Sequence, residues 1–234
     1  MDLQLIKECE AKAQAWLSSP YYDEETKAEI REMMQNEDKT ALIDAFYQNL
    51  EFGTGGLRGI MGAGTNRMNK YIVGMATQGF ANYLLKAFPE GKQLSVVVGH
   101  DCRNNGRLFA ETVAAIFSAN GIKVYLFESL RPTPEVSFAI RHLHAQAGVN
   151  VTASHNPKEY NGYKAYWEDG AQVLAPHDKG IIDEVNKVKM EDVKLQAVPE
   201  LIEIIGGEVD YDYMQAVHEA MIDQDVILRQ KDLN

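Results

Sequence analysis

The stretch QLSVVVGHDCRNNGRLFAETVAAIFSANGIKVYLFE, residues 93–128, contains a strand pattern, a helix pattern and a second strand pattern in succession. QLSVVVGHD is a short run rich in β-branched residues that ends in polar side chains. RLFAETVAAIFSANG has a helical pattern, and its Asn120-Gly121 pair is typical of a helix C-terminus. IKVYLFE then reads as an apolar strand. We predict a β-α-β unit here.

The flanking stretches continue this alternation. GMATQGFANYLLKAF (74–88) comes before it with a helical pattern, and PEVSFAIRHLHA (134–145) follows as a helix with Pro134 at its start. AGVNVTAS (147–154) is the next strand. This βαβαβ rhythm predicts an α/β sheet with helical crossovers. Ligands of such sheets bind at the carboxyl ends of the strands, and both GHDCRN and TASHNP lie at such ends.

Helical patterns also fill the first 50 residues. DEETKAEIREMM (23–34) begins with an acidic turn, as a helix N-terminus favours, and DKTALIDAFYQNL (38–50) has apolar residues at i, i+4 and i+8. PHDKGIIDEVNKV (176–188) predicts a later helix. The stretch 199–207 has the character of a domain boundary, and we expect a new helix from Tyr211 on.

The composition is that of a soluble globular protein. Of the 234 residues, 45% are hydrophobic and 24% charged. The net charge of −11 gives little support to nucleic-acid binding, so a bound anion would need cations gathered locally. Two distant cysteines fit a reducing compartment. The N-terminus does not resemble a signal peptide and no apolar run is long enough to span a membrane, so we expect a cytoplasmic protein without a membrane partner.

TASHNPKEYNGYKAY, residues 152–166, places a serine and a histidine directly after an apolar strand. An ordinary turn is one interpretation. A hydrolase is disfavoured, because its nucleophile elbow needs G-x-S-x-G and Ser154 is flanked by Thr152 and Asn156. A catalytic Ser-His pair also normally joins residues distant in sequence, whereas Ser154 and His155 are adjacent. The remaining interpretation is a nucleophile that a substrate can reach.

FGTGGLRG, residues 52–59, is a second candidate for phosphate binding. It lacks the lysine-serine ending of a P-loop and does not fit G-x-G-x-x-G. Its glycines nevertheless expose backbone N–H groups, and Arg58 beside them can donate two parallel hydrogen bonds to a phosphate. The alternative is a flexible glycine turn with a surface arginine.

Other polar residues favour structural roles. His142, His144 and His155 lack the spacing and the fixed acidic partner of a metal site, so the first two are better explained as solvated residues at a helix end. Asp101, Arg103 and also Arg107 follow a strand and could bind a phosphate or form an ion-pair scaffold beneath the site. We favour the scaffold.

Four motifs occur together and in order: FGTGGLRG, VGHDCRNNGRLFAE, RPTPEVSFAI and GVNVTASHNPKEYNGYKAY. The combination resembles the α-D-phosphohexomutase superfamily, the phosphoglucomutases and phosphomannomutases, over about residues 40–190. The form FGTGGLRGIMG and the helical lead-in look most like the branch that includes phosphopentomutases. The resemblance implies a three-layer α/β/α domain with a mixed sheet, preceded by N-terminal helices.

The same resemblance implies roles for four residues. Ser154 matches the serine that carries a phosphoryl group and passes it to a sugar phosphate, and the resulting bisphosphate reorients before returning its other phosphate. Lys164 matches a general base and acid near the transferring oxygen. Arg58 and His155 match groups that position or neutralise phosphate. Phosphoryl transfer relies mainly on such positioning and neutralisation. Lys158 and Arg67 are candidates for further local cations.

The resemblance further implies Mg²⁺, bound by the serine phosphate and by a D-G-D-x-D-R loop, and a sugar bisphosphate activator. The stretches 210–212 and 223–225 do not fit that loop, so Ser154 is the one metal ligand expected here. We therefore expect an N-terminal helical extension (1–40), phosphohexomutase domain I (41–200) and the start of a truncated second domain (207–234). Such a chain, an N-terminal fragment of the enzyme, is expected to be inactive alone.

The expected function is a phosphosugar mutase that interconverts the 1- and 6-phosphates of glucose. A phosphopentomutase or a phosphomannomutase is an alternative with the same chemistry. A noncatalytic phosphate-binding or interaction domain is an alternative of another class, disfavoured by the presence of both Ser154 and Lys164. The oligomeric state is left open.

Overall fold

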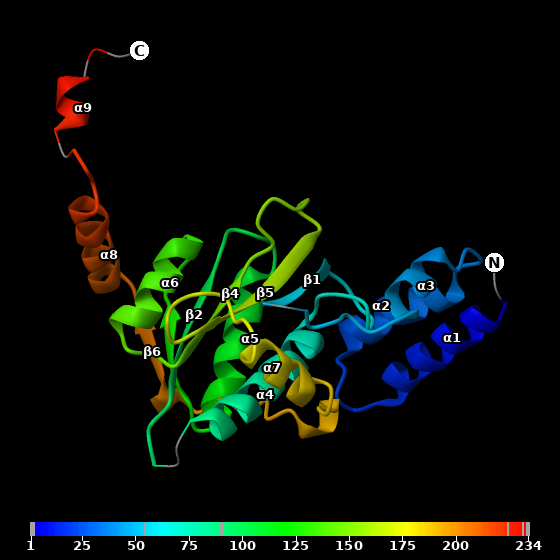
Figure 1. Cartoon of the computed structure of the whole chain (residues 1–234). Helices are drawn as coiled ribbons and strands as arrows, with labels where there is room; N and C mark the ends of the chain where they lie inside the picture. The colour runs from blue at the N-terminus through cyan, green and yellow to red at the C-terminus, as the bar shows by residue number, and fades with distance from the viewer. Residues whose placement is uncertain (1–2, 54, 89–90, 224, 231, 233–234) are drawn as a thin grey trace.

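The computed structural model describes residues 3–53, 55–88, 91–223, 225–230 and 232. Thr54 of the glycine-rich stretch and parts of the expected second domain (residues 224, 231, 233 and 234) lie outside this range. Six strands form one mixed sheet in the order β1-β5-β4-β2-β3-β6 (Figure 1). Their bounds are β1 Gly56–Ile60, β2 Ser95–His100, β3 Lys123–Phe127, β4 Ala147–Val151, β5 Tyr160–Trp167 and β6 Ile202–Ile205.

Helices cover both faces of this sheet, which confirms the predicted three-layer α/β/α fold (Figure 1). One face packs against α4, α5 and α7, and the other against α6 and α8. The helices are α1 Leu3–Ser18, α2 Glu24–Gln35, α3 Thr40–Phe46, α4 Lys70–Ala87, α5 Gly106–Ala119, α6 Thr133–His142, α7 His177–Val185, α8 Gly207–Glu219 and α9 Val226–Arg229.

The β-α-β unit predicted from residues 93–128 is confirmed. Strands β4, β2 and β3 run parallel, and every residue of β2 is buried. Helix α5 ends at Ala119, Asn120 is its C-cap, and Gly121 follows with φ of +78°, a backbone conformation that glycine adopts without a steric penalty. The carboxyl ends of β2 and β4 therefore lie side by side, because these strands are hydrogen-bonded neighbours.

The antiparallel part of the sheet was not located by the sequence patterns. Strand β5 pairs antiparallel with both β4 and β1, so the glycine-rich stretch forms an edge strand instead of a loop. Gly56 faces Lys164 in this pairing. A Cβ atom on Gly56 would lie 1.7 Å from the carbonyl oxygen of Tyr163, so only glycine allows the two strands to approach so closely.

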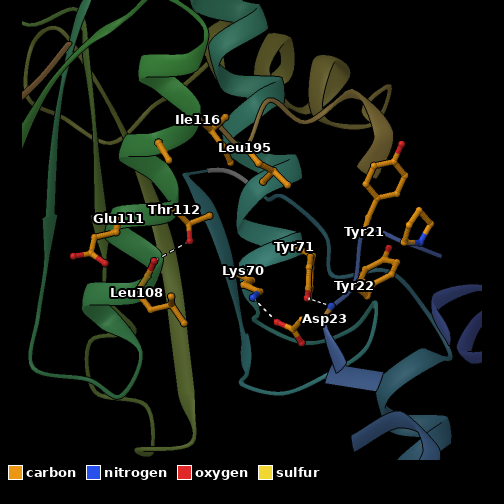
Figure 2. Close-up of a pocket in the computed structure, with 12 residues that line it drawn as sticks. Tyr21, Tyr22, Asp23, Lys70, Tyr71, Leu108, Glu111, Thr112, Ile116 and Leu195 are labelled. Atoms are coloured by element: carbon orange, nitrogen blue, oxygen red, sulfur yellow. Dashed lines mark hydrogen bonds and ion pairs between the residues drawn. The ribbon is translucent and has the colours of Figure 1, made fainter. Parts of the chain in front are cut away.

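The N-terminal helices pack on the α/β domain. Trp16 stacks on Tyr22 with ring centroids 4.0 Å apart, and both rings contact Tyr71 of α4 edge-on. The Tyr71 hydroxyl accepts a hydrogen bond from the backbone N–H of Asp23 at 2.8 Å, and Lys70 pairs with the Asp23 carboxylate at 2.5 Å (Figure 2). The extension therefore shares a hydrophobic cluster with the domain.

The C-terminal part adds a sixth strand that the sequence patterns did not predict. Strand β6 pairs in parallel with β3, although residues 202–205 lie beyond the expected domain end at 200. Helix α8 then packs on α6, where Phe138 contacts Tyr213. The predicted new helix thus starts at Gly207, and the division into domains stays a prediction.

His142 is an exposed residue at the end of α6, as predicted. The prediction that it lacks an acidic partner is wrong, because its Nε2 lies 3.1 Å from Oδ2 of Asp212. The partner comes from α8, seventy residues along the chain, so nothing in the local sequence indicated it.

Within the described ranges, none of the helices is both long and apolar enough to cross a bilayer.

Candidate functional site

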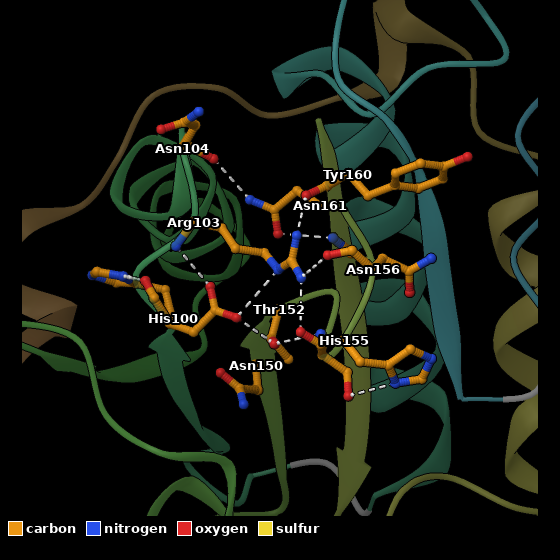
Figure 3. Close-up of polar contacts among 12 residues, drawn as sticks. His100, Arg103, Asn104, Asn150, Thr152, His155, Asn156, Tyr160 and Asn161 are labelled. Carbon is orange, nitrogen blue, oxygen red and sulfur yellow. Dashed lines mark hydrogen bonds and ion pairs between the residues drawn. The ribbon is translucent and has the colours of Figure 1, made fainter. Parts of the chain in front are cut away.

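Ser154 lies on the loop that follows β4, which we call the serine loop (residues 152–159). Its backbone has φ of +55°, in the left-handed region that side-chain-bearing residues rarely occupy. The Ser154 side chain is exposed, and its backbone N–H donates to Oγ1 of Thr152 at 3.1 Å (Figure 3). Nδ1 of His155 lies 3.4 Å from Oγ of Ser154. The loop thus presents the serine hydroxyl at the surface with an imidazole beside it.

Arg103 binds the serine loop from its inner side. Its Nη2 donates to the carbonyl oxygens of Ser154 at 2.7 Å and Asn156 at 2.6 Å. Its Nη1 donates to the carbonyl oxygens of Pro157 at 2.8 Å and Tyr160 at 2.9 Å (Figure 3). The structure therefore supports the predicted scaffold role for Arg103, whose donors are occupied by protein carbonyls.

Asp101 connects β2 to the same loop. Its Oδ2 accepts a hydrogen bond from the Thr152 hydroxyl at 2.5 Å and lies 3.6 Å from Nε of Arg103. Its Oδ1 accepts from the Arg103 backbone N–H at 3.0 Å. A second link is made by the buried Asn161, which donates to the carbonyl oxygen of Asn104 at 3.0 Å. The loop is therefore held at its beginning and at its end by residues that follow β2.

Arg58 reaches the serine loop from the edge strand β1. Its Nη1 donates to Oδ1 of Asn156 at 3.0 Å, and its backbone faces Gly162 of β5. The side chain is exposed. The antiparallel pairing of β1 with β5 is what brings residue 58 to a loop almost a hundred residues away.

Lys164 and Arg58 line one polar cavity. Lys164 lies on β5 opposite Gly56, and its side chain is half-buried. The cavity has a volume of about 400 Å³, and Thr152 and Gln172 also line it. Gln172 was missed by the sequence reasoning, because it belongs to a turn after β5 and no local motif marks it.

Two of the other candidate cations, Arg67 and Arg107, form ion pairs outside the serine loop. Arg67 binds the Asp44 carboxylate at 2.7 Å and lines a groove beside α3. Arg107 binds Glu111 at 2.6 Å and the carbonyl oxygens of Phe127 and Glu128. The contacts of Arg107 are therefore with α5 and the end of β3, and the structure does not place it beneath the serine loop. The suggested role of Arg67 as a local cation stays a prediction. Lys158 is an exposed residue of the serine loop.

A complete Mg²⁺ site is not formed by the part of the chain that the structure describes. That part contains no group of three or more histidine, cysteine or acidic side chains able to hold a metal ion. Mg²⁺ requires near-octahedral oxygen coordination, and the Ser154 hydroxyl offers a single oxygen. Asp210 is engaged by Arg131 through Nε at 2.6 Å and Nη2 at 2.8 Å, and this guanidinium lowers the pKa of the Asp210 carboxyl.

A larger cavity, of about 450 Å³, lies between the segment 20–23 and helices α4 and α5 (Figure 2). Aromatic and aliphatic residues form much of its wall, among them Tyr21, Tyr22 and Leu108. It is lined by none of the residues predicted for phosphate transfer. We therefore place the candidate active site at the polar cavity beside Ser154.

Comparisons with known proteins agree with this fold. The family model for "Phosphoglucomutase/phosphomannomutase, alpha/beta/alpha domain I" matches residues 49–192. The chain belongs to the phosphoglucomutase/phosphomannomutase family. This confirms the predicted family and places the match on the first of that family's domains.

Individual relatives are longer than this chain. A protein of Schizosaccharomyces pombe named probable phosphoribomutase is 47% identical over 159 residues, which cover 68% of this chain and 27% of the relative. The mouse phosphopentomutase is 42% identical over 187 residues, or 77% of this chain and 29% of the relative. The crystal structure of a putative phosphomannomutase from Thermus thermophilus superposes with a TM-score of 0.64 at 29% identity, covering 74% of this chain and 36% of that one. The chain thus spans little more than a quarter of the length of the two named relatives.

Proposed function

We propose that this chain provides the phosphoryl-carrying part of a phosphosugar mutase, with Ser154 as the residue that accepts and returns the phosphoryl group. One observation carries the proposal. The Ser154 hydroxyl is exposed on a tightly held loop, and this loop borders a polar cavity lined by Arg58 and Lys164. A phosphoserine carries about −1.5 to −2 charges at neutral pH, and we propose that both cations neutralise it. Thr152 is the residue of the serine loop that lines the same cavity.

The chemistry consists of two transfers in opposite directions. In the first, a hydroxyl of the sugar phosphate attacks the phosphorus of phosphoserine, the bond to Ser154 Oγ breaks, and a sugar bisphosphate forms. In the second, Ser154 Oγ attacks the other phosphate of the reoriented bisphosphate, and that sugar oxygen leaves. In the first transfer, Lys164 takes the proton of the attacking sugar hydroxyl and passes it to the leaving Ser154 Oγ. In the second, it takes the proton of the attacking Ser154 hydroxyl and passes it to the leaving sugar oxygen. Arg58 and His155 bind the phosphoryl oxygens.

The sugar is proposed to be a pentose 1-phosphate or a glucose 1-phosphate. The names of the S. pombe and mouse relatives, at 47% and 42% identity, favour a pentose. The name of the matching family favours glucose, with O1 and O6 as the exchanged positions, and mannose is the further alternative within it. Groups that bind the distal end of the sugar would decide between them.

Mg²⁺ would neutralise charge on the phosphoryl group, but the described residues alone do not fit it. We propose that its remaining ligands come from outside this chain, and that a sugar bisphosphate primes Ser154. The 234 residues alone are then expected to fold but not to turn over phosphosugar at any Mg²⁺ concentration.

The test is Ser154→Ala in the complete enzyme, with Ser129→Ala as the matched control. Ser129 is another exposed serine at the carboxyl edge of the sheet, following β3. Conversion of ribose 1-phosphate and glucose 1-phosphate is measured together with phosphoserine formation from the sugar bisphosphate, followed by intact mass. We expect Ser154→Ala to abolish sugar phosphate conversion and phosphoserine formation, and Ser129→Ala to leave the two activities unchanged. Persistent turnover by Ser154→Ala would disprove the proposal, and sugar phosphate binding without any phosphoserine in the wild type would favour the noncatalytic alternative.

A further inference from the structure

The environment of Arg103 differs from that of a phosphate ligand. Its side chain is 11% exposed, and its two terminal nitrogens donate to four backbone carbonyl oxygens of residues 154–160. The Asp101 carboxylate balances its charge. Arginine has five N–H donors and no acceptor. Four of them are used by these carbonyl oxygens, and the fifth, on Nε, lies 3.6 Å from the Asp101 carboxylate.

The four carbonyl groups consequently point toward the inner side of the loop. A carbonyl oxygen is the negative end of the peptide dipole, and one directed at a phosphoryl group would repel it. By gathering these oxygens, Arg103 keeps the outer side of the serine loop free of them. The Ser154 side chain is exposed, and the Arg58 guanidinium reaches the loop at the side chain of Asn156.

A second set of contacts fixes the backbone of Ser154. The Asp101 carboxylate can only accept, so the Thr152 hydroxyl donates its proton to it. The lone pairs of the Thr152 oxygen are then available to accept from the Ser154 N–H. The left-handed conformation at φ of +55° is unfavourable for serine and persists only where the surroundings hold it. Arg103, Asp101 and Thr152 provide those surroundings.

We propose that Arg103 is a positioning residue for phosphoryl transfer, which holds the serine loop in its phosphoryl-accepting conformation without contacting the substrate. The expected effect of Arg103 on the rate of transfer rests on the proposed function. Its expected effect on the conformation of the serine loop does not. Lysine cannot replace arginine here, because a single ammonium group lacks the planar fork that reaches carbonyls on two sides.

The kinetic experiment is Arg103→Lys in the complete enzyme, with Arg107→Lys as the matched control. Arg107 lies one turn further along the chain and binds a carboxylate and two backbone carbonyls away from the serine loop. We expect Arg103→Lys to lower kcat and the single-turnover rate of Ser154 phosphorylation about 10²-fold, with KM changed by less than about threefold, because a misplaced nucleophile slows transfer without weakening binding. Arg107→Lys should retain the wild-type rate.

A second measurement tests the loop itself on the 234-residue chain. Amide hydrogen exchange of residues 153–160 should accelerate in Arg103→Lys and stay unchanged in Arg107→Lys. Should Ser154→Ala remain active, the proposed function fails while this measurement still decides the role of Arg103. Unchanged exchange with unchanged kcat in Arg103→Lys overturns the inference. A raised KM at normal kcat also overturns it, because Arg103 would then bind the substrate.

A third variant guards against a folding defect in Arg103→Lys. Thr152→Val keeps the side-chain shape and Arg103, but removes the hydroxyl that connects Asp101 to the Ser154 N–H. We expect a smaller loss of single-turnover rate, about tenfold, with faster exchange at Ser154. If Arg103→Lys does not fold and Thr152→Val phosphorylates Ser154 at the normal rate, the inference is rejected.

Discussion

The guanidinium group of Arg58 and the side-chain oxygen of Asn156 are joined by a hydrogen bond of 3.0 Å, although 98 residues separate them. This contact ties the edge strand β1 to the serine loop. Arg58 is thereby directed toward the serine loop before a phosphate arrives, and a preorganised cation loses less conformational entropy when it binds.

We expect Arg58→Ala to lower kcat/KM for the phosphosugar by about 10- to 100-fold, as the loss of one charge-assisted hydrogen bond predicts. Asn156→Ala should cost less, because Arg58 keeps its charge and loses only its orientation. Steady-state kinetics of both single variants and the double variant give the coupling energy. Strictly additive losses would show that Asn156 does not orient Arg58.

Lys164→Met should lower kcat by about 10² to 10⁴, with a much smaller change in KM, if the amine transfers protons. Methionine has a similar length and lacks the charge, and the half-buried position of residue 164 tolerates an apolar side chain. Lys179→Met, an exposed substitution on α7, is the control. Normal turnover with weakened binding in Lys164→Met would make this residue a phosphate ligand only.

Gly56→Ala should destabilise the chain by about 2 to 4 kcal/mol, because its Cβ would overlap the Tyr163 carbonyl at a φ of +137°. Gly207→Ala is the matched control, since a Cβ there meets nothing within 4 Å, and it should change stability by less than about 1 kcal/mol. Urea denaturation followed by circular dichroism measures both. Equal stability of the two variants would contradict the tight β1–β5 pairing.

Glu135 gives the chain a pH-dependent stability. Burial raises the pKa of its carboxyl, and the nearby Asp210 carboxylate adds to this, whereas the Arg131 guanidinium, 3.7 Å away, opposes it. The folded state therefore binds the proton more tightly than the unfolded state. The protonated carboxyl therefore contributes stability at low pH. This contribution falls as the pH rises above 4.5, the ordinary pKa of a glutamate carboxyl, and through the raised pKa of about 7.

Glu135→Gln should remove this loss, because the amide stays neutral and can still donate to Asp210. The melting temperature of the wild type is expected to fall relative to Glu135→Gln between about pH 4.5 and neutrality. Glu168→Gln, at an exposed position, is the control and should follow the wild type. Parallel curves for wild type and Glu135→Gln would show that Glu135 titrates normally.

Local patterns were sufficient to predict the parallel strands β2, β3 and β4. The apolar run 96–98 marks β2, and Gly121 marks the end of α5, because each requirement is satisfied by neighbouring residues. Strands β1 and β6 lacked such signals. The glycines of β1 break a helical pattern in the sequence. In the structure, Gly56 lets β1 approach the Tyr163 carbonyl closely, and this partner lies more than a hundred residues away.

The candidate site shows the same division. Ser154 and Lys164 belong to one contiguous motif, so both candidates could be named from the sequence. For Arg103, the sequence indicated an ion-pair role but not its other partners. Four of its hydrogen bonds go to backbone carbonyls, which carry no sequence signature. Gln172 and Asp212 were missed because each acts through a tertiary contact with a distant element.

Strand β1 lies at the margin of the sheet, and within the described chain β5 is its one neighbouring strand. Marginal strands open at a lower free-energy cost than central ones. Each opening of β1 withdraws Arg58 and one wall of the cavity, while Ser154 keeps its anchorage to Arg103 on the far side. If Arg58 and Ser154 have the proposed roles, we therefore expect substitutions that loosen β1 to weaken anion binding without disturbing the serine loop.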